Sequence, residues 1–159
     1  MTTQELSRPR HDRDFYAWAL DQARRLRELA RLRPNEPIDW ELLADEVEDM
    51  GKTTWRTCAS LLELIVAHLL KLAWSGQDGP RGHWRGEIAA FRSELSDALT
   101  TAIENDLKAE LERRYQRARK RAIERLAEEE PDFPARLPES CPYTWEQITG
   151  DWLPERAVA

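Results

Sequence analysis

The stretch that decides the fold is CASLLELIVAHLLKLAW, which spans residues 58–74. Its polar residues are few, and they are Ser60, Glu63, His68 and Lys71. At about 100° per residue these four fall on one side of a helix, so almost all of the remaining circumference is apolar. A helix of this kind is usually buried among other helices. We therefore expect residues 53–74 to form the central helix of a helical bundle.

The same stretch raises the question of a membrane span, because its length is close to the minimum that crosses a bilayer. Glu63, His68 and Lys71 lie within it, and each charge at the centre of a bilayer costs roughly 2.5–3.5 kcal/mol. Residues 1–15, MTTQELSRPRHDRDF, contain no apolar segment of the kind that a signal peptide needs. We therefore expect the core helix of a soluble protein, located in the cytoplasm.

Composition favours one folded domain. The chain has 159 residues, of which 41% are hydrophobic and 34% charged, with a net charge of −6 and seven tryptophans. This apolar content argues against a disordered chain, and the length fits a single domain. Cys58 and Cys141 lack the closely spaced partners of a zinc site or a disulfide framework. We expect a helical domain over residues 12–154, between short tails at residues 1–11 and 155–159.

The remaining segments also have helical patterns. Apolar stripes at helical spacing predict further helices over residues 14–33, 39–50, 84–101 and 105–126. Asp12 or Asp14 is placed to cap the first of these, and Asp39 the second. Gly51, followed by Thr53, favours a break before the central helix. Because no run of alternating β-branched residues occurs, the predicted class is all-α, a single-domain bundle of about five helices.

The last segment, residues 131–154, is rich in proline and aromatic residues. Thr144 and Gln147 have the spacing of a capping box, and Gly150 is placed to end the short helix that it starts. Trp145 and Trp152 are available to pack this segment onto the bundle. We expect it to cap one end of the helices.

Five segments stand out when the chain is taken as a whole. They are DFYAWALDQARRLR (14–27), LADEVEDMGK (43–52), LIVAHLLKLAW (64–74), the lone Trp84, and FPARLPESCPYTWEQITGDWLP (133–154). In this order they resemble a bacterial family known as domain of unknown function, family 29, over about residues 12–154. The most specific parts are HLLK at residues 68–71 and the CPY segment. The resemblance implies a compact helical fold in bacteria, and it implies no reaction and no catalytic residues.

One candidate polar site centres on His68, with Glu63 and Lys71 on the same edge of the central helix. A buried ionisable group needs a partner, since desolvation otherwise neutralises it. In the functional interpretation, His68 is a base or a ligand that faces acids of the 39–50 helix, either Glu46 or Asp49, and Trp84 belongs to the same candidate site. The plainer alternative is that His68 is a satisfied core residue and that Lys71 pairs with the acidic helix.

Motifs for metals and cofactors are missing from the sequence. It contains no Glu-x-x-His pair of the ferritin-like di-iron type and no His pair at i, i+4 of the zinc-protease type. We therefore predict neither a metal site nor a cofactor, and no catalytic residue is assigned.

A candidate nucleic-acid surface lies on the Arg-rich stretch 113–125. Its bases are Arg113, Arg114, Arg117, Arg119, Lys120 and Arg121. Clustered arginines neutralise phosphates, and such binding weakens with salt. The chain is acidic overall, however, and Glu112 and Glu124 suit ion pairs along a solvated helix.

The leading functional hypothesis is a cytoplasmic protein-interaction or adaptor module without catalytic activity, whose partner is another protein or a second copy. It rests on the segregated charge, since acids dominate the 39–50 helix and bases dominate its neighbours, and complementary patches steer association. One alternative is a nucleic-acid-associated protein that uses the 113–125 helix. The other is a small enzyme or metal-binding protein centred on His68 and the acids of the 39–50 helix.

Overall fold

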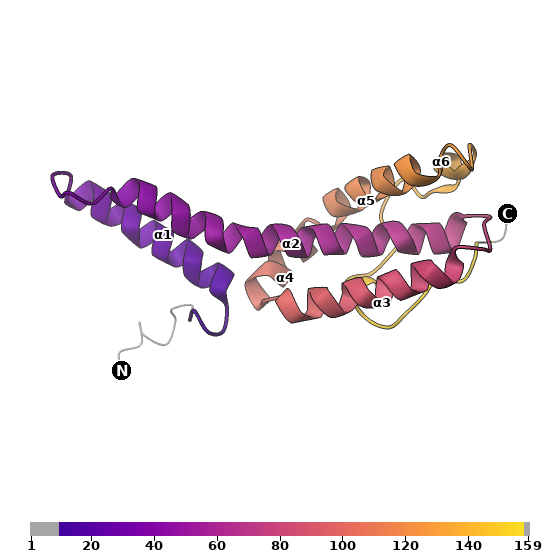
Figure 1. Ribbon diagram of the computed structural model, residues 1–159, viewed down its shortest axis with the longest axis horizontal. Coiled ribbons are helices and arrows are strands. Elements are labelled where there is room, and N and C mark those ends of the chain that lie inside the picture. Colours follow the sequence, from indigo (N-terminus) through magenta and orange to yellow (C-terminus); the bar gives the residue numbers. More distant parts are fainter. Residues whose placement is uncertain (1–9, 158–159) are drawn as a thin grey trace. The chain divides into compact units, whose positions relative to one another are not determined.

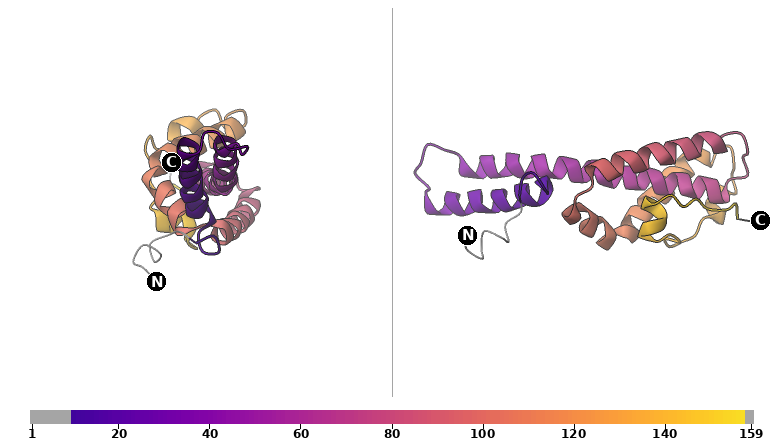
Figure 2. Two further views of the ribbon diagram at one scale, coloured as in Figure 1. Left: turned by 90° about the vertical axis from the view of Figure 1, so that its left-hand side faces the viewer. Right: turned by 90° about the horizontal axis from the view of Figure 1, so that it is seen from below.

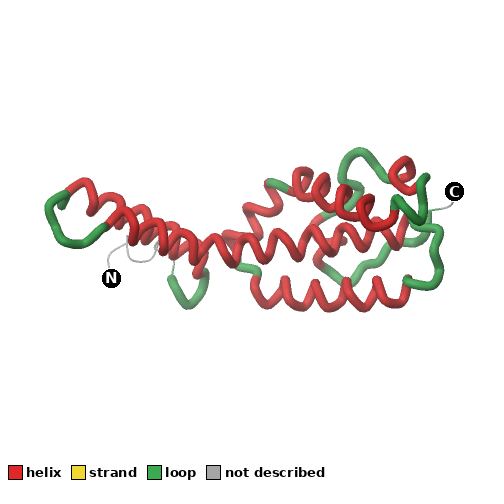
Figure 3. Tube along the Cα trace, turned by 45° about the horizontal axis from the view of Figure 1, so that its top comes forward, coloured by secondary structure: helices red, strands yellow, loops and turns green. Residues whose placement is uncertain are grey.

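A computed structural model describes residues 10–157 of the chain. Every regular element in this range is a helix, which confirms the predicted all-α class (Figures 1 and 3). The residues group into two compact units, one of Met1–Thr57 with Thr100–Asn105 and one of Cys58–Leu99 with Asp106–Ala159. Compactness does not test whether each unit folds separately, so the single domain over residues 12–154 stays a prediction.

The predicted tails fall mainly outside the described residues. Of the N-terminal tail, residues 1–11, only Arg10 and His11 are described. Of the C-terminal tail, residues 155–159, the described part is held against the second unit, because the Ala157 N–H donates to the Ala73 carbonyl at 2.7 Å.

The first unit is built on a helical hairpin. Helix α1 (Phe15–Leu32) lies antiparallel to the N-terminal half of α2 (Trp40–Trp74), as the right-hand view of Figure 2 shows. Asp14 caps α1 as predicted, by accepting a hydrogen bond from the Ala17 N–H at 3.0 Å. Its other carboxylate oxygen accepts from the Ala102 N–H at 3.0 Å. One carboxylate therefore fixes both the start of α1 and the first turn of α4 (Thr101–Ala109).

The predicted break at Gly51 is wrong, because α2 is one continuous helix. Gly51 keeps a negative φ and does not end a helix. It serves close approach instead, since a Cβ added there would lie 2.7 Å from the Ala19 Cβ. The Thr53 hydroxyl donates to the Asp49 carbonyl four residues earlier, at 2.9 Å, and does not cap a new helix. Asp39 does cap α2, by accepting from the Leu42 N–H at 3.0 Å.

The second unit holds the large core. Helices α3 (Arg81–Ala98) and α5 (Leu111–Leu126) run along the C-terminal half of α2 (Figure 1). The largest side chains of its interior are almost completely buried, and they are Leu62, Ile65, Leu69, Leu70, Leu72, Ile88, Leu95, Leu107, Tyr115, Phe133 and Ile148. The central apolar stretch therefore packs as the sequence predicted.

Length and apolar composition alone would let one described helix, α2, cross a membrane. Within the most apolar part of this helix, 78% is buried inside the protein. A buried apolar helix is what the core of a soluble protein requires.

The predicted helix over residues 105–126 is interrupted. Helix α4 ends at Ala109 and α5 starts at Leu111, with Glu110 between them at φ −100° and ψ 12°. Asn105 does not start a helix but lies inside α4. Packing overrides its weak helix propensity, since Ile103 and Leu107 on either side of it are fully buried.

The C-terminal segment packs on the helices of the second unit. Its short helices are α6 (Phe133–Arg136) and α7 (Trp145–Thr149), and the predicted capping box of Thr144 and Gln147 is present. The Arg92 guanidinium of α3 donates to the carbonyls of Gln147, Ile148 and Trp152, each at 2.8 Å. One arginine of α3 therefore holds three points of this segment.

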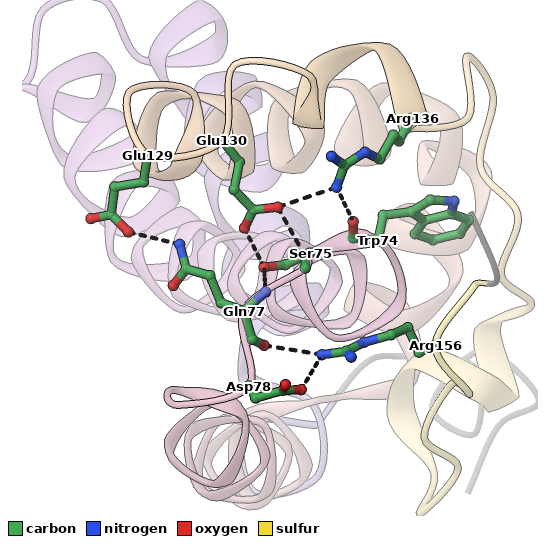
Figure 4. Close-up of polar contacts among 9 residues, drawn as sticks. Trp74, Ser75, Gln77, Asp78, Glu129, Glu130, Arg136 and Arg156 are labelled. Carbon is green, nitrogen blue, oxygen red and sulfur yellow. Dashed lines mark hydrogen bonds and ion pairs between the residues drawn. The ribbon is translucent and has the colours of Figure 1, made fainter.

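A carboxylate ties down the end of α2 (Figure 4). Glu130 accepts hydrogen bonds from the Ser75 hydroxyl and from the Gly76 N–H, the latter at 2.9 Å. Arg136 pairs with the same carboxylate at 3.2 Å and donates to the Trp74 carbonyl at 3.3 Å. Burial raises the pKa of Glu130, but the bonds from Ser75, Gly76 and Arg136 outweigh burial and hold this pKa below its usual value.

Candidate functional site

A pocket of about 890 Å³ opens among α2, α3 and α5 of the second unit. Three residues of the predicted polar site line it, namely His68, Lys71 and Trp84, and so does Arg121 of the candidate nucleic-acid surface. The walls are mixed, since Leu64, Ala67, Pro80, Phe91, Ala122 and Leu126 contribute apolar surface beside the charged side chains. Pockets of this size and mixed character are typical of small-molecule sites.

His68 is held at two points on the pocket wall. Its Nδ1 lies 2.8 Å from the Leu64 carbonyl one turn earlier, and its Nε2 is hydrogen-bonded to Glu87 of α3. A carbonyl only accepts hydrogen bonds, so Nδ1 carries a hydrogen and donates it to the Leu64 carbonyl. Burial lowers the pKa of His68, and so does the nearby Lys71 charge, whereas the bonds to Leu64 and Glu87 act in the opposite direction.

Glu87 joins a second histidine to the pair. The His83 Nε2 lies 3.3 Å from the other Glu87 oxygen, one turn back along α3. Each oxygen of this carboxyl group therefore lies close to an imidazole. Among the described residues no group of three or more His, Cys, Asp or Glu side chains has an arrangement that holds a metal ion.

Lys71 is the least satisfied charge of the pocket. Its side chain is buried, and its Nζ lies 5.2 Å from the centre of the Trp84 ring. Within residues 10–157 the ammonium makes neither a hydrogen bond nor an ion pair. Burial lowers the pKa of Lys71 to about 8, assisted by Arg125 and opposed by Glu87. The predicted pairing of Lys71 with the acidic helix is therefore wrong.

Glu63 belongs to a separate cluster and is not part of the pocket wall. It is 2% exposed and lies 3.0 Å from Arg114, 3.0 Å from Arg117 and 3.4 Å from Arg121, all on α5. Arg114 also pairs with Glu110 at 2.8 Å. A single buried carboxylate thus gathers three arginines, and it fixes α5 against α2.

The six bases of the candidate nucleic-acid surface are divided by these contacts. Arg114, Arg117 and Arg121 pair with Glu63, while Arg119 donates to the Pro134 carbonyl at 3.2 Å. Lys120 is exposed and lies 3.9 Å from Glu124, and Arg113 is also exposed. Most of this arginine charge is directed at the protein's own carboxyl and carbonyl groups.

Glu46 and Asp49 do not meet His68, contrary to the sequence-based expectation. All three residues lie on the continuous helix α2, on which positions so far apart in sequence cannot touch. Glu46 is exposed, and Asp49 pairs with Arg56 at 3.5 Å. Both acids belong to the hairpin of the first unit.

One flank of this hairpin is charged. Ala19 of α1 faces Gly51 of α2 at the point of closest approach. Beside that contact, Arg27 of α1 pairs with Asp45 at 2.8 Å and with Glu48 at 3.0 Å. The charged side of α1 and the charged side of α2 therefore lie on the same flank of the hairpin.

The opposite flank of the hairpin is apolar. We call it the apolar flank, and it consists of Trp18, Leu26, Leu29, Leu43, Val47 and Met50. At about 100° per residue, the three residues of α1 lie on the side of Ala19 that is opposite to Arg27. The three residues of α2 lie on the side of Gly51 that is opposite to Asp45 and Glu48. Because the charged sides of the two helices adjoin, their apolar sides adjoin as well. Leu43 is 43% exposed and Met50 is 57% exposed, so this surface is open in the described chain.

Glu87 is a residue of the candidate site that was not predicted from the sequence. The apolar stripe of α3 includes Trp84, Ile88 and Phe91, and Glu87 lies three residues after Trp84 and four before Phe91. That spacing puts its carboxylate on the same side of the helix as both aromatic rings. An acid inside an aromatic stripe was the signal available in the sequence.

Comparisons with known proteins agree with this helical architecture. The model of a family described as "Domain of unknown function DUF29" matches residues 11–153, which confirms the resemblance drawn from the sequence. A solved structure, described as an alpha-helical protein of unknown function from Rhodospirillum rubrum, has 26% sequence identity and a TM-score of 0.74, and the match covers 89% of each chain. No curated protein matches the chain.

Proposed function

The chain belongs to the DUF29 family, and we propose that it is a protein-interaction module whose α1–α2 hairpin binds the same hairpin of a second copy. The observation that carries this proposal is the apolar flank. Two helices that pack only on each other cannot enclose large side chains, so their apolar sides stay in water until another surface covers them. The exposed Leu43 and Met50 are the clearest members.

The distribution of exposed apolar residues supports a partner for the first unit, and two of these residues, Leu43 and Met50, belong to the apolar flank. Large exposed apolar side chains in the described range are Leu32, Ile38, Leu42, Leu43, Met50, Trp152 and Leu153. All but Trp152 and Leu153 lie in the first unit. Apolar patches that exceed the scattered exposure of an ordinary surface mark protein–protein contacts.

Charge at the edges of the apolar flank favours a second copy as the partner. At about 100° per residue, Arg25 borders it on the α1 side and Glu46 borders it on the α2 side. In a two-fold arrangement, α1 of one copy can lie over α2 of the other copy. Arg25 of each copy then faces the border of the flank that carries Glu46 in the other copy. Such self-complementary surfaces are what isologous dimers require.

We also place this module in the cytoplasm of a bacterium. Both cysteines are free thiols, which fits a reducing compartment. The solved relative comes from Rhodospirillum rubrum. Binding of nucleic acid through the 113–125 helix stays a prediction, and it has less support because Glu63 engages Arg114, Arg117 and Arg121.

Sedimentation equilibrium of the purified chain tests the proposal, at concentrations up to about 100 µM so that weak dimers are detected. We expect a dimer for the natural sequence and a monomer for the double variant Leu43→Glu/Met50→Glu. Leu153→Glu, which changes an exposed leucine of the second unit, is the matched control and should remain dimeric. A monomeric natural sequence, or a dimer that persists in the double variant, contradicts the proposal.

A further inference from the structure

The pocket of the second unit has no part in hairpin association, and it points to a separate binding site. We propose that this pocket, among α2, α3 and α5, binds a small organic anion whose acidic group pairs with Lys71 and whose apolar part contacts the aromatic wall of Trp84 and Phe91.

Lys71 is the buried cation with which the acidic group of the ligand would pair. A buried ammonium loses its hydration, and it is normally compensated by a carboxylate or by hydrogen bonds from the protein. Lys71 has only the face of the Trp84 ring, a weaker compensation, within the described residues. Lys71 is nonetheless one of the residues that line the pocket. A ligand with an acidic group supplies the missing partner.

The charge balance of the wall points the same way. Arg121 and Arg125 of α5 line the pocket with Lys71, and Arg121 also pairs with Glu63 at 3.4 Å. The acids that line the pocket are Glu87 and Glu124. Glu87 is already bonded to His68 and His83, while Glu124 lies 3.9 Å from Lys120. Arg125 makes no ion pair with any described residue. Positive charge is thus left over where a ligand would sit, and it selects an anion.

Size and lining select the rest of the ligand. A volume of about 890 Å³ suits a small molecule. Leu64, Phe91 and Leu126 offer apolar contacts that inorganic phosphate alone would not use. The preferred ligand therefore combines an acidic group with an apolar or aromatic body, and it is held by both.

Isothermal titration calorimetry of the full chain at low salt tests the site with three probes. They are 1-naphthyl phosphate, its neutral counterpart 1-naphthol, and inorganic phosphate. We expect one molecule of 1-naphthyl phosphate per chain, bound at least about tenfold more tightly than either of the others, because only it uses both kinds of contact. Absence of binding, or equal binding of 1-naphthol, overturns the proposal.

Variants of single residues test which side chain binds the acidic group of 1-naphthyl phosphate. Lys71→Met keeps the length and burial of the side chain and removes its charge, and it should weaken 1-naphthyl phosphate binding about tenfold or more. Lys120→Met, at a side chain that is 79% exposed on α5, should leave the affinity unchanged. Arg125→Gln, at an exposed position of the wall, provides a second reading and should weaken binding by a smaller factor. Unchanged affinity in both Lys71→Met and Arg125→Gln overturns the assignment.

Discussion

The two compact units of this chain solve the packing of helices in different ways. In the hairpin of the first unit, α1 and α2 meet through small residues, since Ala19, Ala23 and Ala44 are fully buried and Gly51 admits the backbone of α1. In the second unit, large side chains such as Leu69, Tyr115 and Phe133 fill the interior. The comparison teaches that the second unit encloses large apolar side chains, whereas the first leaves large apolar side chains such as Leu43 and Met50 exposed.

The ion pairs of the two units also differ in how far they are buried. The hairpin uses exposed or half-exposed ion pairs such as that of Arg27 with Asp45, which contribute little to stability. The second unit buries Glu63 with Arg114, and removal of either partner would leave the other charge without compensation in the interior.

The largest expected effect is therefore in the second unit, at Glu63. We expect Glu63→Ala to lower the free energy of unfolding by about 3–5 kcal/mol, because the buried Arg114 guanidinium loses its partner. Glu124→Ala, which removes a 62% exposed carboxylate 3.9 Å from Lys120, should cost less than about 1 kcal/mol. Urea denaturation followed by circular dichroism measures both. If the two variants are equally stable, burial of the Glu63–Arg114 pair does not make it more important for stability than an exposed pair of the same unit.

A smaller effect is expected in the first unit, at Gly51. Gly51→Ala places a Cβ 2.7 Å from the Ala19 Cβ, so α1 and α2 must move apart. We expect a loss of about 1–3 kcal/mol in the free energy of unfolding, as for other overpacked sites. Amide hydrogen exchange of residues 15–32 should become faster, because these residues form the other arm of the hairpin.

Two controls sharpen this test. Gly86→Ala in α3 meets nothing within 4 Å and should stabilise the protein by up to about 1 kcal/mol, since alanine favours helices. The double variant Ala19→Gly/Gly51→Ala removes the clashing methyl group from the opposite helix and should recover part of the loss. Unchanged exchange of α1 in Gly51→Ala would mean that the close contact does not hold the hairpin.

The smallest effect is expected at Glu130, and it depends on pH. The pKa of this carboxyl is lowered in the folded protein, so its stabilising bonds are complete above the unfolded value of 4.5 and are lost as the pH falls through the folded value. At pH 7 we expect Glu130→Gln to cost about 1–2 kcal/mol. The difference from the natural sequence should shrink in acid, as urea denaturation at a series of pH values can show. The exposed Glu128, changed to Gln, should have no effect at any pH.

Local signals in the sequence were reliable where the chemistry is local. Asp14 and Asp39 cap their helices, and Thr144 with Gln147 forms its capping box, because the groups involved lie within three residues of each other. Gly51 was misread for the opposite reason. A glycine that ends a helix and a glycine that admits a neighbouring helix look the same until the neighbour is known.

The candidate site shows the same division. His68, Lys71 and Trp84 were identified from polarity and spacing, and the structure brings them together on one pocket wall. The partner of His68 was not found, because Glu87 is 19 residues away on a different helix. The acids that the sequence proposed, Glu46 and Asp49, lie on the same helix as His68 and out of its reach.

The sequence by itself determined that residues 58–74 form a buried helix and that the class is all-α, since apolar periodicity records which side of each helix avoids water. Only the tertiary structure decided which charges meet. It placed Glu63 among three arginines, left Lys71 without a carboxylate partner among the described residues, and left Leu43 and Met50 of the hairpin exposed. The physical reason is that burial follows from the pattern along each helix, whereas pairing depends on how separate helices are set against one another.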